Sequence, residues 1–237
     1  MSNDLIHEVE ESLKQERMEA LWKEYGSYVI AACVLAVLFT AAISGWRSYN
    51  ARANAHDSEL IMTALDAEDK PAALAEIVGQ DLRGGHEAVA RLTAAGLLMQ
   101  EGEEDKALEH YRAAAADSDV PKMFRELATY LAVRTEWSMD KDDADSQAFI
   151  SQLRPVIANT DSSWRYHSRV LAAMIYASDL NDYQAAREVL APVLEERNLP
   201  FSLIQSARAL DQVYREKMSM TQTAPDTAST TTEEPQG

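Results

Sequence analysis

The chain has few of the features that most restrict a protein's partners and chemistry: it has one cysteine, few basic residues and little glycine or proline. Cys33 is the only cysteine among 237 residues, so no disulfide can form within the chain. The 22 Lys and Arg residues stand against 39 Asp and Glu residues, a formal net charge of −17. Nucleic-acid binding through phosphates needs a basic surface, so the composition argues against nucleic acid as a partner. An acidic surface would instead favour basic partners.

Motifs of catalysis, metal binding and phosphate binding are also missing from the sequence. His86 and Glu87 begin an HExxH pattern, but Ala90 occupies the position of the second histidine. The acidic run within 140–145 has the composition of a calcium loop without its central glycine. No glycine-rich phosphate loop and no nucleophile elbow occurs. We therefore predict a protein that is not an enzyme and has no metal or cofactor, with an enzyme of unrecognised site as a rival class.

One long run without charge interrupts the polar sequence. Residues 25–46 form 22 consecutive positions without Asp, Glu, Lys or Arg, with Trp22 and Trp46 among the aromatic residues that flank the run. A helix of this length spans roughly 33 Å, which matches the hydrocarbon core of a bilayer. A cleaved signal peptide would have a shorter apolar region after a basic segment, whereas here seven acids and three bases precede the run. We predict a retained transmembrane helix over 25–46.

The residues around this span predict its orientation and its packing. Lys14, Arg17 and Lys23 precede it, which favours a cytoplasmic N-terminus, and residues 1–24 read as an acidic amphipathic helix that either meets a partner helix or self-associates. Small residues recur at every fourth position of the span, a spacing that lets another membrane helix approach closely. The stripe consists of Ala32, Ala36, Thr40 and Ser44.

The rest of the chain predicts an all-α domain over 47–218 and a disordered Ser/Thr/Pro tail over 219–237. Ala, Leu and Glu are abundant, Gly and Pro occur at a few joints, and the alternation typical of strands is missing. Helices are expected over 48–66, 71–79, 86–100, 103–116, 121–138, 146–159, 163–179, 183–196 and 200–218.

These helices predict a worn repeat of helix pairs. Segment 102–114 has an echo in 181–190, and both units end in a proline, Pro121 and Pro200. In each, a small residue that lets helices approach is followed four positions later by a large apolar residue. The pattern is typical of the second helix of a tetratricopeptide repeat, and about four units with a capping helix are expected. The packing residues are Ala73 with Ile77, Ala107 with Tyr111, and Ala186 with Leu190. An unrelated helical bundle rich in alanine is the alternative.

The order of parts, with the run Gly45-Trp46-Arg47-Ser48-Tyr49-Asn50 at the end of the span, resembles the YfgM family, the ancillary subunit of the bacterial SecYEG translocon. The resemblance implies a single-pass protein of the bacterial inner membrane with its repeats in the periplasm. It also implies translocon subunits and a PpiD-like membrane-anchored chaperone as partners, exported polypeptides as possible ligands, and assistance to newly exported proteins as the task. A membrane-anchored repeat scaffold for envelope assembly or cell division is the alternative.

Overall fold

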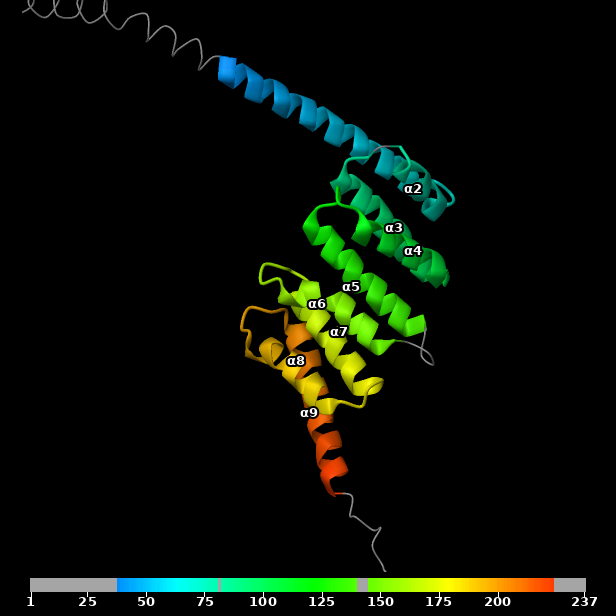
Figure 1. Cartoon of the computed structure of the whole chain (residues 1–237). Coiled ribbons are helices and arrows are strands. Elements are labelled where there is room, and N and C mark those ends of the chain that lie inside the picture. The colour runs from blue at the N-terminus through cyan, green and yellow to red at the C-terminus, as the bar shows by residue number, and fades with distance from the viewer. Residues whose placement is uncertain (1–37, 81, 140–144, 224–237) are drawn as a thin grey trace, which may run out of the picture. The chain divides into compact units, whose positions relative to one another are not determined.

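The computed structural model of the chain describes residues 38–80, 82–139 and 145–223, and within these ranges every regular element is a helix. This confirms the all-α class. A first helix is described over 38–65. It is followed by α2 (Lys70–Val78), α3 (Gly84–Glu101), α4 (Glu104–Ala116), α5 (Lys122–Met139), α6 (Ser146–Ala158), α7 (Arg165–Ser178), α8 (Tyr183–Glu195) and α9 (Phe201–Thr223), as Figure 1 shows. The chain divides into two compact units, Met1–His56 and Asp57–Gly237.

Aspartate residues begin three of the helices in the same way. The side chains of Asp69, Asp145 and Asp182 accept hydrogen bonds from the backbone N–H groups three residues ahead, at 3.0, 3.1 and 2.9 Å. Each bond satisfies an N–H group that has no partner inside its helix and contributes about 1 kcal/mol. Because the capped helices are α2, α6 and α8, the same signal marks the second helix of three pairs.

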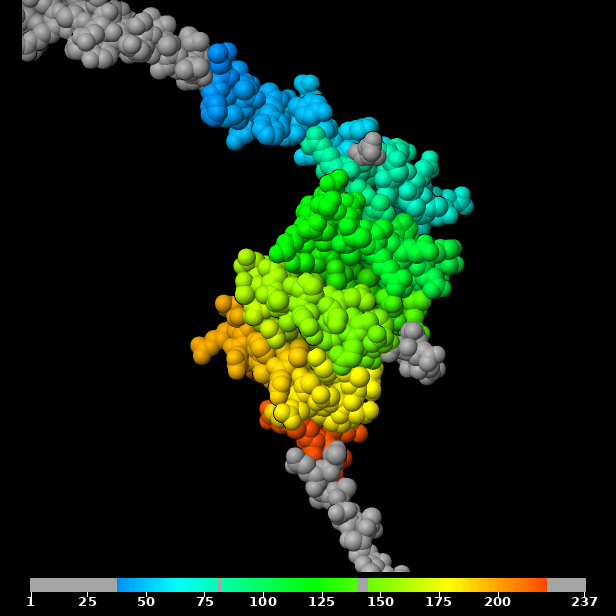
Figure 2. Space-filling model, viewed as in Figure 1, coloured from blue at the N-terminus to red at the C-terminus, as the bar shows by residue number. Residues whose placement is uncertain are grey.

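The helices of the second unit stack as pairs. Each helix from α2 to α9 packs on the next in the chain, and α3, α5, α7 and α9 also contact one another in succession. Among α2 to α9, the alternate helices α2, α4, α6 and α8 do not contact each other. In the space-filling view the pairs follow one another in chain order (Figure 2). We call α3, α5, α7 and α9 the inner helices and α2, α4, α6 and α8 the outer helices, since closer approach on one side curves a solenoid toward that side.

The predicted packing residues lie in the cores between these helices. Ala107 and Ala186 are fully buried, and Tyr111 and Leu190 lie in the same two cores as these alanines. Ile77 is buried in a third core. Ala73 is only half-buried there, because its neighbour Leu74 points fully inward instead. The repeat positions of the two clearest units therefore lie at close helix contacts, while the first unit is shifted by one residue.

Most helix ends lie within two residues of the expected bounds, and two places differ more. The first helix runs without a break from 38 to 65 and so joins the end of the predicted span, 25–46, to the helix expected over 48–66. The last helix, α9, reaches Thr223, five residues beyond the predicted end at 218. No glycine or proline occurs between Pro200 and Pro225, so nothing in the sequence stops the helix earlier. The expected tail thus begins in helix, and its remainder, 224–237, lies outside the described residues.

Most of the predicted membrane segment also lies outside the described residues, as do residues 1–24. Residues 25–37 are not described, and 38–46 belong to the first helix. Within the described ranges, no helix combines the length and the apolar character needed to cross a bilayer. Large apolar side chains are nevertheless exposed along 38–49; they are Leu38, Phe39, Ile43, Trp46 and Tyr49.

Candidate functional site: the inner groove

Three inner helices together enclose a pocket. It holds about 160 Å³ and draws its lining from α5, α7 and α9 alone. The pocket therefore lies where the inner helices contact one another, and no outer helix contributes to its lining. We call it the inner groove; its lining residues are Tyr130, Arg134 and Trp137 of α5, His167, Val170, Leu171 and Met174 of α7, and Leu203 of α9.

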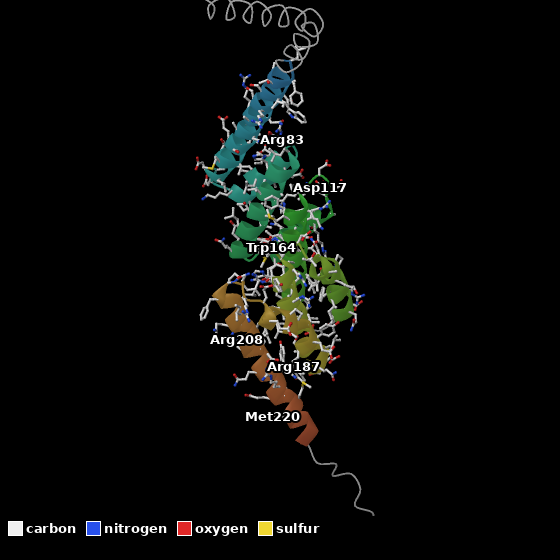
Figure 3. All side chains as sticks on the ribbon, turned by 90° about the vertical axis from the view of Figure 1, so that its left-hand side faces the viewer. Arg83, Asp117, Trp164, Arg187, Arg208 and Met220 are labelled. Atoms are coloured by element: carbon white, nitrogen blue, oxygen red, sulfur yellow. The ribbon has the colours of Figure 1, made fainter. Side chains whose placement is uncertain are left out.

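An aromatic cluster closes one end of the inner groove. The rings of Tyr130 and Trp164 stack with centroids 6.4 Å apart, and His167 lies 6.1 Å from Tyr130 and 5.5 Å from Trp164. Trp164 stands at the start of α7, between the turn at Asp117 and the helices that carry Arg187 and Arg208 (Figure 3). Ring contacts at such separations favour a fixed mutual arrangement. The cluster therefore joins α5 to α7 at this end.

Hydrogen bonds fix the opposite end of the groove. The indole N–H of Trp137 donates to Asp179 Oδ2 at 2.8 Å, and Ser146 Oγ donates to the same oxygen at 3.0 Å. These bonds connect the end of α5 with the start of α6 and the end of α7. A charge-assisted bond of this kind is stronger than a neutral one, so the ring of Trp137 is held as a rigid wall.

The charge of the inner groove is opposite to that of the chain. Arg134 is its only fully charged lining residue, and none of the described residues that line it is acidic. Other arginines are paired: Arg91 with Glu87 at 2.6 Å and Arg112 with Glu136 at 2.7 Å. Arg134 is exposed and forms no ion pair with a described residue. The groove thus presents one guanidinium without an ion-pair partner among the described residues, together with apolar side chains.

Several buried polar atoms beside the groove have no hydrogen-bond partner. They include Trp164 Nε1, His167 Nδ1 and Ser168 Oγ, and Ser168 is completely buried. Burial also lowers the pKa of His167, which keeps its ring neutral at neutral pH. A buried polar atom without a hydrogen-bond partner costs about 1–3 kcal/mol. The start of α7 therefore has more unpaired buried polar atoms than most protein cores have.

Two further arginines of α7 serve its packing instead. Arg169 donates from Nη1 to the backbone oxygen of Val189 in α8 at 3.2 Å, and the guanidinium of Arg165 lies 5.3 Å from the ring centroid of Tyr166. Burial lowers the pKa of Arg169, and the nearby charge of Arg165 lowers it further. Neither residue lines the inner groove. Both are on the α8 side of the helix, where they brace one pair.

A second hollow lies on the outer side of the domain. It holds about 290 Å³ between α2 and α4, with contributions from the end of α3. Burial lowers the pKa of His110 at its edge, and the charge of Arg91 adds to this effect. We call it the outer groove; its lining residues are Asp69, Pro71, Ala72, Ala75, Leu98, Glu101, Glu103, Lys106, Glu109 and His110. Acidic residues predominate among the charged ones.

The sequence analysis did not find the residues of the inner groove. Tyr130, Arg134 and Trp137 recur at helical spacing on α5, and His167 and Met174 do so on α7, so a signal was present. Those on α5 fall in the unit where the predicted repeat is least regular. Of the predicted membrane stripe, Ala32 and Ala36 lie outside the described residues, while Thr40 and Ser44 are exposed on the first helix. Across the described ranges no set of three or more His, Cys, Asp or Glu side chains is arranged to hold a metal ion.

Comparison with known proteins identifies the repeat. Residues 19–130 match the family described as tetratricopeptide repeat-like domain. No curated protein and no solved structure gives a significant match. The matched segment ends within α5, so α7 and α9, which complete the inner groove, lie beyond it. Together with the stacked helix pairs, the match shows that the chain carries a tetratricopeptide repeat-like domain.

Proposed function

We propose that this protein is a scaffold that holds a segment of another protein in its inner groove and performs no catalysis. The observation that carries the proposal is the pocket built by α5, α7 and α9. Curved arrays of helix pairs bind their partners along extended concave surfaces, and domains of this repeat type generally mediate protein contacts. An apolar floor with a few directed polar groups is the usual chemistry of such a site.

We further propose that residues 25–46 anchor this scaffold in a membrane. The exposed apolar side chains along 38–49 support the proposal, because large apolar surface is costly in water and favourable in lipid. Trp46 and Tyr49 are of the type that lies at headgroup depth. An anchor raises the effective concentration of the groove beside a membrane machine. Extraction of isolated membranes with alkaline carbonate tests this step, since release of the full chain would contradict it.

The resemblance to the YfgM family supports a more specific version. In it the N-terminus is cytoplasmic, the repeats are periplasmic, and the partners are translocon subunits and a PpiD-like membrane-anchored chaperone. The protein then assists newly exported polypeptides as they leave the translocon. The stripe with Ala32, Ala36, Thr40 and Ser44 would pack against a membrane helix of the translocon.

Crosslinking in intact membranes tests these partners. A photoreactive residue at Met174 reports on the inner groove, one at Ala36 on the membrane stripe, and one at exposed Arg154 of the outer helix α6 serves as control. Tyr111 would be a poor position because its side chain is buried. We expect translocon adducts from Ala36 and chaperone or exported-chain adducts from Met174 only. Adducts to envelope-assembly or division proteins alone would favour the alternative scaffold, and no protein adduct from Met174 would contradict the groove.

A further inference from the structure

We propose that the inner groove selects an internal peptide segment in which an acidic side chain stands beside an aliphatic one. Arg134 pairs with the carboxylate, and the floor formed by Val170, Met174 and Leu203 receives the aliphatic side chain. This inference rests on the proposed scaffold function and names the chemistry of its partner. It departs from the net charge of the chain, which by itself favours basic partners.

The charge of the groove favours an acidic ligand. A cation that already pairs with a carboxylate of its own chain gains little from a ligand, whereas Arg134 has no such partner among the described residues. A guanidinium also binds a carboxylate through two parallel hydrogen bonds, which adds direction to the attraction. A basic segment would place its charge against Arg134. The carboxylate at the groove's end, Asp179, already accepts hydrogen bonds from Trp137 and Ser146. The groove therefore discriminates between ligand charges in favour of acids.

The size and the apolar lining of the pocket favour an aliphatic side chain. About 160 Å³ is close to the roughly 150 Å³ of an apolar cavity known to accept a benzene molecule, so one branched aliphatic side chain fits. Val170 and Met174 are one turn apart on α7, and Leu203 faces them from α9. The flexible thioether of Met174 adapts to side chains of different shape. The floor thus demands an apolar group without specifying which one.

The polar atoms near Trp164 can bind the backbone of a peptide segment. Trp164 Nε1 and His167 Nδ1 have no hydrogen-bond partner among the described residues, and the two rings contact each other. A small rotation of either ring offers a hydrogen bond to the backbone of a passing segment. The groove lies across three helices and is open, which suits a segment that continues on both sides rather than a chain end. Because Trp137 lines the groove, its fluorescence also reports binding.

Fluorescence anisotropy with labelled peptides tests the proposal on the full chain in detergent micelles. The probes are 13-residue peptides of repeating Ser-Glu-Leu, Ser-Gln-Leu, Ser-Lys-Leu and Ser-Glu-Ser, each with blocked ends so that no terminal carboxylate contributes. We expect the Ser-Glu-Leu peptide to bind about tenfold more tightly than the Gln peptide, and the Lys and Ser-Glu-Ser peptides to bind more weakly still.

Matched variants assign the effect to the groove. R134Q should weaken the Glu peptide about tenfold and leave the Gln peptide unchanged, and R134E should reverse the preference toward the Lys peptide. R154Q removes an equally exposed arginine from α6 and should change nothing. M174S should weaken all three Leu-containing peptides. Arg134 is exposed, so thermal unfolding of its variants should match that of the unchanged protein.

The outcomes separate this inference from the proposed function. Equal binding of the Glu and Gln peptides, with both weakened by M174S, would overturn the acidic preference and leave a groove that binds apolar segments. Loss of the Glu preference in R154Q as well as R134Q would also overturn it, since the charge effect would then be general. Absence of peptide binding together with absence of adducts from Met174 would contradict the scaffold function itself.

Discussion

The inner and outer grooves of the repeat domain differ most in their charge. The outer groove is lined by four acids, Asp69, Glu101, Glu103 and Glu109, against Lys106 and His110. The inner groove has no acid among its described lining residues and one arginine. The difference teaches that a net charge of −17 describes no single surface of this protein. Many of its acids lie at helix starts and turns, where carboxylates accept bonds from free N–H groups.

The helix cores near the two grooves also differ in packing. At the α3 to α4 contact the core contains the fully buried alanines Ala95 and Ala107, which let the helix backbones approach closely. Among α5, α6 and α7 the core contains larger side chains such as Phe149 and Leu171. The inner groove lies beside this second core, since Leu171 belongs to both.

The largest test of this contrast removes a core side chain beneath the inner groove. Leu153 is completely buried in the core that also contains Leu171, a lining residue. We expect Leu153→Ala to destabilise the domain by about 3 kcal/mol through the cavity it leaves. Because contacts in a repeat array reach only neighbouring units, amide hydrogen exchange should rise mainly in α5 to α7. Leu153→Met is the control, and an equal rise in α3 and α4 would contradict the separation of the two regions.

A second test targets the joint of the first regular unit. A Cβ atom built at Gly84 would lie 1.9 Å from the backbone oxygen of Asp119, which cannot move aside as a side chain can. We expect Gly84→Ala to destabilise the domain by about 2 kcal/mol, measured by urea unfolding. At Gly85 the nearest atom is Pro121 Cγ at 3.9 Å, an ordinary contact, so Gly85→Ala is the matched control. Because helix propensity favours alanine over glycine at both positions, a Gly84 variant as stable as the Gly85 variant would contradict the close approach.

A third test concerns the helix that closes the inner groove. Arg187 Nε lies 2.8 Å from Asp211 Oδ1, and Arg215 pairs with the other oxygen of this buried carboxylate. Burial raises the pKa of Asp211, but the bonds from both arginines outweigh it and hold the pKa below its usual range. The pair therefore stabilises the fold above the unfolded pKa of about 4 and loses its effect as pH falls through the folded value.

For this reason Asp211→Asn should destabilise the domain by about 2 kcal/mol at pH 7 and by less at pH 3. Urea unfolding at both pH values measures the difference. Asp161, an exposed acid in the α6 to α7 turn, provides the control substitution to Asn. A constant loss at both pH values would mean that the shape of the side chain, not its charge, locks α9 onto α8. The inner groove would then be closed by packing alone.

The contrast also separates what sequence could predict from what it could not. Helix bounds such as 71–79 against Lys70–Val78 follow from local signals, namely Asp caps, glycine ends and prolines. The small residues Ala107 and Ala186 could be found because each stands beside its own turn signal. The inner groove joins Tyr130, Met174 and Leu203 from three helices, and no local pattern links residues so far apart. The net charge of the chain does not indicate the charge of the groove lining, because it sums the charges of all surfaces.

The smallest expected effect concerns the ion pair at the outer groove. Lys106 Nζ lies 3.1 Å from Glu103 Oε2, but these side chains are 64% and 49% exposed. Such a pair gains little in water, and holding both long side chains in one geometry costs entropy, so Lys106→Gln should change the free energy of unfolding by less than about 0.5 kcal/mol. The same change at Arg187, which is bound to buried Asp211, should cost several times more. If the free energy of unfolding of the Lys106 variant fell by more than about 1 kcal/mol, the acids of the outer groove would form a stabilising network of ion pairs instead of separately hydrated charges. The charge contrast between the grooves would then reflect two constructed sites instead of one.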